Sequence, residues 1–239
     1  MLELERITKR FGRVVVADDL SLQVGPGDAV GVVGPNGAGK TSLFGLVSGD
    51  LSPDSGEVRF LGRSVTRLDT AGRCRLGIGR TYQVPRPFPE LTVLENVLVA
   101  AQQGAGERGR AAVATARAVL DLAGLAPLAA RRAGQLGLLQ RKRLELARAL
   151  ATRPTLLLLD EVAGGLTDPE VAELVEIVRT ARADGLAVLW IEHVVRALTS
   201  TVERLICLAG GRLVGDGRPE DVLASRAVRE VFLGTPGGA

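Results

Sequence analysis

One short stretch carries the clearest chemistry in this sequence. Residues 34–41 read Gly-Pro-Asn-Gly-Ala-Gly-Lys-Thr and match the Gly-x4-Gly-Lys-Ser/Thr pattern of a phosphate-binding loop. Glycines let successive backbone N–H groups turn inward around phosphate oxygens without Cβ clashes. The lysine adds a mobile positive charge, and the threonine hydroxyl can ligate Mg²⁺. The stretch predicts a site for the β- and γ-phosphates of a nucleotide, formed by Gly34, Pro35, Asn36, Gly37, Ala38, Gly39, Lys40, Thr41 and Ser42.

Two adjacent carboxylates follow an apolar run further along the chain. Leu156–Leu159 is followed directly by Asp160 and Glu161. This places the pair at the carboxyl end of a predicted buried strand, where ligands bind in open α/β sheets. We expect Asp160 to act on Mg²⁺ through water and Glu161 to act as general base on the attacking water. An acidic pair at a strand end can also be a solvated turn, but the phosphate loop upstream favours the catalytic interpretation.

The chain contains one histidine, His193, which follows the apolar run 186–191 and Glu192. A single histidine is most often a surface residue or a satisfied core residue. If the run is a sheet neighbour of the acidic strand, however, the imidazole lies within reach of the γ-phosphate. We prefer this second interpretation.

The elements that must position these groups alternate between strands and helices. Residues 29–33 before the loop form a predicted buried strand, and residues 41–47 after it a helix. Residues 2–7 and 20–24 alternate with period two, as half-buried strands do. Asp168, as N-cap, with Pro169 at the first helical position predicts another helix start. The order predicts an α/β fold with a P-loop NTPase core, a mostly parallel sheet and antiparallel N-terminal strands.

The middle third lacks strand signals and is predicted to be helical. Residues 111–122 and 141–151 are rich in Ala, Leu and Arg, and turns separate them over residues 125–139. We expect one domain over residues 1–239. Its nucleotide-binding core would comprise residues 1–82 and 153–239, with a C-terminal helical segment, and residues 83–152 would form an inserted helical subdomain.

The composition narrows the class of protein. Hydrophobic residues make up 46% and aromatic residues 3%, so Leu, Val, Ile and Ala must build the core. The net charge of +3 is spread without a basic block, so we expect no nucleic acid. Cys74 and Cys207 are too few for a disulfide framework, and Cys207 is predicted to be buried. This cysteine usage fits a reducing cytosol, so we expect a cytoplasmic protein. No signal-peptide pattern opens the chain, and no apolar run approaches the ~20 residues that span a bilayer, so we expect that the chain cannot form a transmembrane path by itself.

These stretches together resemble the ATP-binding subunits of ABC transporters over nearly the whole chain. The resemblance implies ATP and Mg²⁺ as cofactors. It implies that Phe11 stacks on adenine, that Gln83 contacts Mg²⁺ and senses the membrane subunit, and that His193 is the switch histidine. The family's D-loop corresponds to Gly165, Leu166, Thr167 and Asp168.

Within the family, the chain is most similar to the branched-chain amino-acid (LIV-type) uptake group. The likeness rests on residues 79–83, 91–97, 163–167, 190–193 and 231–234. It implies amino-acid uptake through a separate membrane permease, with a substrate-binding protein in the periplasm or outside the cell. It also implies a second ATP-binding subunit in a homo- or heterodimer, and a place on the inner face of the cell membrane. Urea, short amides and other amino acids stay open as transported molecules.

The signature motif departs from the family pattern Leu-Ser-Gly-Gly-Gln. Here the aligned residues are Leu136, Gly137, Leu138, Leu139 and Gln140. The serine that donates to the γ-phosphate is missing, and leucines stand where glycines let the backbone approach. Losing one charge-assisted hydrogen bond costs on the order of 1.5–3 kcal/mol. We therefore expect the site completed by this signature to be weak or inactive, whereas the chain's own phosphate loop would use a partner's signature.

Other interpretations compete with a transport ATPase. The altered signature favours a regulatory nucleotide-binding subunit with little hydrolysis, which the intact Asp160, Glu161 and His193 oppose. ABC ATPases of translation or DNA repair usually carry two cassettes or a long coiled coil, and neither fits 239 residues. A P-loop kinase would need an acceptor pocket and lid arginines, for which no pattern is present. Residues 82–91 are expected either to receive a coupling helix of the permease or to form a rigid surface loop.

Overall fold

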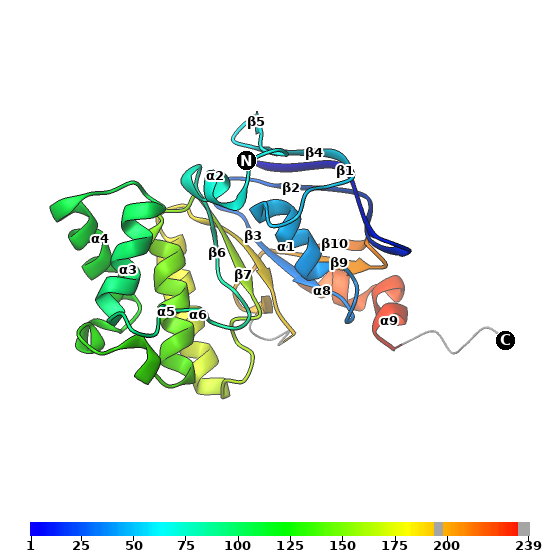
Figure 1. Ribbon diagram of the computed structural model, residues 1–239. Coiled ribbons are helices and arrows are strands. Elements are labelled where there is room, and N and C mark those ends of the chain that lie inside the picture. Colours follow the sequence, from blue (N-terminus) through cyan, green and yellow to red (C-terminus); the bar gives the residue numbers. More distant parts are fainter. Residues whose placement is uncertain (194–197, 234–239) are drawn as a thin grey trace. The chain divides into compact units, whose positions relative to one another are not determined.

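The computed structural model describes residues 1–193 and 198–233 (Figure 1). It divides into two compact units. Unit 1 contains residues 1–70 and the described part of 189–239, and unit 2 contains residues 71–188. Gly234, the last residue of the stretch 231–234, lies outside the described residues. Among the residues described, no helix has the length and apolar character needed to cross a membrane.

An antiparallel sheet forms the N-terminal part of unit 1. Its strands are β1 (Leu2–Phe11), β2 (Val14–Val24), β4 (Ser55–Phe60) and β5 (Arg63–Ser64), in the order β2-β1-β4-β5. In β1 the side chains of Leu2, Leu4 and Ile7 are fully buried, while the charged residues between them stay accessible. The period-two pattern of the sequence thus produces a sheet with one apolar face, and the predicted antiparallel N-terminal strands are confirmed.

A second sheet in unit 1 carries the phosphate loop. Strand β3 (Ala29–Val33) runs parallel to β9 (Arg204–Ala209), and β10 (Arg212–Gly217) is antiparallel to β9. Strand β8 (Ala187–Ile191) is the neighbour of β3 on its other side. The strands β3 and β8 are continuous apolar runs and are buried along their whole length, as strands of a parallel sheet usually are. Helices α1 (Lys40–Ser48), α8 (Pro219–Ala224) and α9 (Arg226–Leu233) also belong to this unit.

Unit 2 contains a short parallel pair of strands that positions the acidic residues. Strand β6 (Ile78–Arg80) follows helix α2 (Thr70–Arg75) and pairs with β7 (Leu156–Asp160), so that Ile78 lies opposite Leu156. Because the two strands are parallel, their carboxyl ends lie at the same edge. Residues 81–83 and 160–161, which are far apart in sequence, therefore meet there.

Three helices of unit 2 pack side by side: α3 (Val93–Gln103), α4 (Gly109–Leu122) and α5 (Leu138–Ala151) (Figure 1). Their shared core contains many alanines, among them Ala101, Ala112, Ala116, Ala147 and Ala151, which allow the helix axes to approach closely. Short 3₁₀ turns at Ala126–Leu128 and Ala133–Gln135 connect α4 to α5. The helical character predicted for the middle third is present in the structure.

Helix α6 (Asp168–Arg182) begins one residue differently from the prediction. Its N-cap is Thr167, not Asp168, which is the first helical residue. The Glu170 carboxylate accepts hydrogen bonds from the Thr167 backbone N–H and hydroxyl, both at 2.8 Å. This reciprocal arrangement satisfies the helix start, and it leaves Asp168 free to act through its charge on the helix dipole.

Candidate functional site

The phosphate loop connects β3 to α1 in unit 1, and two of its glycines are required by their surroundings. Gly34 and Gly39 have positive φ angles of 153° and 103°. A Cβ on Gly34 would lie 2.2 Å from the Leu208 carbonyl oxygen, and one on Gly39 would lie 2.3 Å from that of Val16. No other residue type fits these contacts, so the backbone is held in the curved form that presents N–H groups to an anion.

Lys40 lies at the first position of α1, with its side chain folded back over the loop. Its ammonium group donates to the carbonyl oxygens of Gly34 at 2.7 Å and Pro35 at 3.0 Å. The neighbouring Thr41 is exposed, and among the described residues no side chain makes a capping hydrogen bond at the N-terminus of α1. A positive charge, a helix N-terminus and an inward-turned loop together make an anion site.

Cys207 in β9 lies near this lysine. Burial raises the pKa of the Cys207 thiol to about 11, although the Lys40 ammonium acts in the opposite direction. The thiol therefore stays protonated at neutral pH, and the side chain is a fully buried apolar residue, as predicted.

Phe11 ends β1 with half of its surface exposed. The Lys9 ammonium lies 5.5 Å from the ring centroid and binds Asp54 at 2.8 Å. Asp54 also accepts the Arg10 N–H at 2.8 Å. The Lys9 hydrogen bond, followed by that of Arg10, lowers the pKa of Asp54. This network fixes the strand end that carries the aromatic ring.

His193 belongs to unit 1 and follows β8 with an exposed side chain. Its backbone N–H donates to the Glu192 carboxylate at 3.1 Å. Its exposure excludes the interpretation as a buried core residue.

The acidic pair lies at the end of β7 in unit 2. Asp160 is 4% exposed, and its carboxylate binds the Arg80 guanidinium at 3.0 Å. Its backbone N–H donates to the Thr81 hydroxyl at 3.2 Å. The carboxyl end of β6 therefore holds Asp160 by both side chain and backbone.

Glu161 is the next residue, and its φ of +47° is left-handed. This conformation costs a non-glycine residue about 1–2 kcal/mol. The Gln83 amide donates to the Glu161 carboxylate, and the Glu161 carbonyl accepts from Gly164 N–H at 3.3 Å and from the Lys142 ammonium at 3.1 Å. These contacts maintain the strained backbone, and strain of this kind is common at functional sites.

The altered signature forms the start of α5. Gly137 is its N-cap, and the Gln140 side chain accepts the Gly137 N–H at 3.2 Å. Leu138 is 42% exposed, and its Cδ2 lies 3.3 Å from the position that a Cβ on Gly165 would occupy. Leu138 therefore lies against the loop before Leu166, Thr167 and Asp168.

The oxygen donors predicted for Mg²⁺ are a carboxylate, a hydroxyl and an amide, on Asp160, Thr41 and Gln83. Among residues 1–193 and 198–233, no group of three or more His, Cys, Asp or Glu side chains could hold a metal ion. Mg²⁺ usually takes one or two carboxylates, keeps waters and binds substrate phosphates. The donor set thus fits a Mg²⁺ ion that is bound together with a nucleotide, and it does not fit a metal site made of protein ligands alone.

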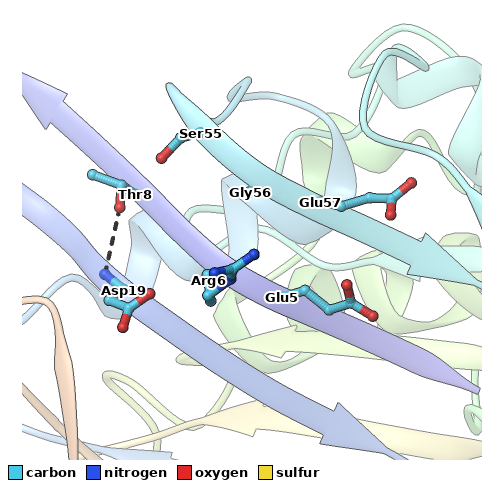
Figure 2. Close-up of a pocket in the computed structure, with 7 residues that line it drawn as sticks. All are labelled: Glu5, Arg6, Thr8, Asp19, Ser55, Gly56 and Glu57. Carbon is cyan, nitrogen blue, oxygen red and sulfur yellow. Dashed lines mark hydrogen bonds between the residues drawn. The ribbon is translucent and has the colours of Figure 1, made fainter.

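A hollow of about 470 Å³ lies elsewhere, on the antiparallel sheet of unit 1 (Figure 2). Arg6 and Asp19, which line it, have φ angles near +50°. The Asp19 N–H points to the Thr8 hydroxyl at 3.5 Å. The register of β1 shifts at this point, so the hollow results from a bulge. No predicted nucleotide residue lines it.

The predicted site residues thus form two groups. The phosphate loop, Phe11 and His193 belong to unit 1, whereas Gln83, Asp160, Glu161, the signature and the D-loop belong to unit 2. The structure brings Gln83 to Glu161 and the signature to the D-loop. Sequence reasoning missed Arg80 and Lys142. The second had a signal, because it is one of only three lysines in an Arg-rich chain.

Comparison with known proteins identifies the family. The family described as ABC transporter matches residues 17–164. The ribose import ATP-binding protein RbsA 1 of Rubrobacter xylanophilus is 36% identical over 97% of this chain, which spans 48% of that relative. The probable branched-chain amino acid transport ATP-binding protein LivG of Methanocaldococcus jannaschii is 32% identical, and the lipopolysaccharide export system ATP-binding protein LptB of Acidithiobacillus ferridurans is 34% identical. Each of these two alignments covers 98% of this chain and 97% of the relative.

Comparison with solved structures agrees with this family assignment. An ATP-binding cassette of an ABC transporter in its ADP conformation matches with a TM-score of 0.87 and 31% identity over 98% of each chain. A dimeric cassette in a post-hydrolysis state, bound to ADP and Pi, matches with a TM-score of 0.82 and 25% identity, over 92% of this chain and 99% of that one. The predicted P-loop fold is confirmed. With the family match over residues 17–164, these findings show that the chain belongs to the ABC transporter family, as one of its ATP-binding cassettes, which are ATPases coupled to transport.

Proposed function

We propose that this chain binds ATP with Mg²⁺ and hydrolyses it to power uptake through a separate membrane permease. The observation that carries this proposal is the geometry of the phosphate loop. Gly34 and Gly39 admit no Cβ, Lys40 is the first residue of α1, and no side chain makes a capping hydrogen bond at the N-terminus of α1 in the described part of the chain. Such a site attracts phosphate groups.

In the proposed mechanism the loop and Lys40 hold the β- and γ-phosphates, and Phe11 stacks on adenine. Thr41, Asp160 and Gln83 would hold Mg²⁺, which when bound neutralises charge on the phosphates. Arg80 orients the Asp160 carboxylate, because it supplies the opposite charge in a buried place.

Glu161 acts as general base on the attacking water, and Gln83, which donates to its carboxylate, orients it. His193 contacts the γ-phosphate. A variant Glu161→Gln keeps the shape of the side chain and removes its basicity. Nucleotide affinity should stay within threefold, while turnover should fall by a factor of about 100 or more, within the usual range for general-base catalysis.

We further propose that the chain works as a dimer of ATP-binding subunits beneath the permease, on the inner face of the membrane. The dimeric solved relative supports this arrangement. Residues 82–91 would receive the permease, and Val84 and Phe88 in this segment are 68% and 45% exposed. A substrate-binding protein outside the membrane would complete an uptake system.

The transported molecule is proposed to be an amino acid, most simply a branched-chain one. The LIV-like stretches and the LivG relative support this choice, while relatives named for ribose and lipopolysaccharide have similar identity. Cells that depend on this chain should take up labelled leucine, and Lys40→Ala should abolish that uptake while ribose uptake stays unchanged. If ribose uptake falls and leucine uptake does not, the amino-acid assignment is wrong.

A second candidate function is a regulatory subunit that closes on ATP with little turnover. The start of α5 favours it, because Leu138 projects where the family has glycine, and Gln140 already occupies the Gly137 N–H. Measuring nucleotide affinity and turnover on the same preparation separates the two functions. Tight binding with no turnover, alone or in the assembled transporter, would favour the regulatory role.

A further inference from the structure

We propose that Lys142 is a positioning residue that fixes Gln83 and Glu161 together and links both to helix α5. The inference rests on the roles proposed above for Gln83 and Glu161. Lys142 lies in the second turn of α5 and is 5% exposed. No part of the phosphate loop is involved.

The contacts are made to main-chain atoms. The Lys142 ammonium donates to the Glu161 carbonyl at 3.1 Å and to the Gln83 carbonyl at 3.3 Å. An ammonium group has three donors on one atom, so it can hold two carbonyl oxygens from separate segments at the same time. Burying this charge is favourable only when such partners are present.

The orientation of the Glu161 carbonyl group reports the backbone conformation that positions the Glu161 carboxylate. Its residue is in the left-handed region, with φ at +47°, and such a backbone persists only where the surroundings hold it. Lys142 supplies one of those contacts, and Gly164 N–H supplies another on the same oxygen. By fixing the two main chains, the ammonium brings the Gln83 amide and the Glu161 carboxylate into hydrogen-bonding position.

The same face of α5 holds the residues that follow Gln83. Glu145 and Arg148 are three and six residues after Lys142, which puts all three on one side of the helix. Glu145 accepts the Arg86 N–H at 3.4 Å, and Arg148 donates to the Arg86 carbonyl at 2.7 Å. The Arg148 guanidinium also lies 5.2 Å from the centre of the Phe88 ring.

One helix face thus binds residues 83–88 and the strand end at Glu161, while the N-terminus of the helix carries the signature. Any displacement of α5 must move the backbone of Gln83 and Glu161 unless these contacts break. Lys142 is the residue of α5 that contacts both segments. A displacement of the signature would therefore be transmitted through Lys142 to Glu161, the proposed general base.

Amide hydrogen exchange tests this directly on the full chain, without requiring turnover. In Lys142→Met, exchange over residues 82–84 and 161–164 should accelerate at least tenfold, while α4 keeps its wild-type protection. Lys142→Arg, which keeps a charged donor, should restore most of the protection. Arg117→Met, on the exposed surface of α4, is the matched control and should resemble wild type.

Kinetics give the second readout. Lys142→Met should lower kcat at least tenfold and leave KM and ADP affinity within about twofold, because the phosphates are held elsewhere. If Lys142→Met does not fold, Lys142→Gln replaces it, since its side chain is shorter and uncharged and should weaken the contacts to both carbonyls.

Three outcomes overturn the inference: unchanged exchange at both segments, faster exchange across the whole of unit 2, or kcat equal to wild type. Failure of the proposed function would give a different result, because the wild-type chain itself would then bind no nucleotide. The exchange pattern could still be measured in that case.

Discussion

Helices α1 and α5 both begin beside a glycine, and both starts are predicted to face a phosphate, yet they differ in construction. Before α1, Gly39 is left-handed with φ at 103°, and no side chain caps the helix. Before α5, Gly137 is extended, with φ at −69° and ψ at 173°, and the Gln140 side chain accepts its N–H. Leu138 then projects from the first helical position.

Both helices carry the same kind of partial charge at their N-termini, so the dipole alone does not make a phosphate site. What differs is whether the first amides can be reached. Around α1 the packing excludes a Cβ at Gly34 and Gly39, so no side chain can project from these two positions of the loop. At α5 two side chains fill the corresponding space. A helix start can therefore bind a phosphate only where no side chain covers its first amides.

The largest effect should come from adding a Cβ to the open start. Gly39→Ala would place that atom 2.3 Å from the Val16 carbonyl oxygen, so the loop must move. We expect ADP affinity to fall at least 100-fold, which is about 2.8 kcal/mol. Titration calorimetry on the purified chain measures it.

Gly37→Ala provides the matched control for stability. Gly37 also has a positive φ, of 79°, but a Cβ there meets nothing within 4 Å. Its unfolding free energy should fall by about 1–2 kcal/mol from backbone strain alone. Chemical denaturation should show a clearly larger loss for Gly39→Ala, and equal losses would mean that the Val16 contact is unimportant.

The closed start can be opened in the same way. The double variant Gly137→Ser with Leu139→Gly restores a donor and removes a side chain at the signature. Regaining a hydrogen bond to a charged group, about 1.5–3 kcal/mol, should raise ATP hydrolysis by the assembled transporter roughly tenfold or more. Unchanged hydrolysis would show that the altered signature does not limit turnover.

A smaller effect is expected from the cap itself. Gln140→Ala removes the acceptor of the Gly137 N–H and should lower the unfolding free energy by about 0.5–1.5 kcal/mol. Gln135→Ala, an exposed glutamine in the preceding 3₁₀ turn, is the control. Thermal unfolding that does not distinguish the two variants would argue against a cap at Gln140.

The smallest effect concerns α6, which has a conventional cap. Hydrogen bonds from the backbone and hydroxyl of Thr167 lower the pKa of Glu170 below its ordinary value of 4.5. The ionised carboxylate therefore stabilises the fold above pH 4.5, and this contribution is lost as the pH falls through the lowered pKa. Glu170→Gln should be slightly less stable than wild type at pH 7, and the difference should shrink in acid. A difference that is constant with pH would contradict this assignment.

Local patterns in the sequence predicted the parts of the fold that local chemistry determines. Strand β3, helix α1 and the acidic end of β7 follow from apolar runs and loop residues that are contiguous in the chain. The start of α6 was misplaced by one residue because Thr167 and Asp168 are both good N-caps. Only the carboxylate of Glu170, which binds Thr167, decides between them.

The contacts that hold the acidic pair could not be predicted in this way. Arg80 and Asp160 are 80 residues apart, and Lys142 lies 59 residues from Gln83. They meet only because β6 and β7 are parallel and end at one edge. Contacts between residues so far apart in the chain leave no periodic pattern in the sequence. The roles assigned to these residues, to Phe11 and to His193 stay predictions until they are measured.

The central claim is tested most directly by Mg²⁺-dependent ATP binding and hydrolysis of the purified chain beside Lys40→Ala. Trp190, the only tryptophan, is buried in β8 and provides a fluorescence signal for binding. The account predicts that wild type binds ATP with Mg²⁺, that Lys40→Ala loses the binding, and that any turnover disappears with it. Absence of nucleotide binding by the folded wild-type chain would contradict the account, because every role assigned here depends on the phosphate loop.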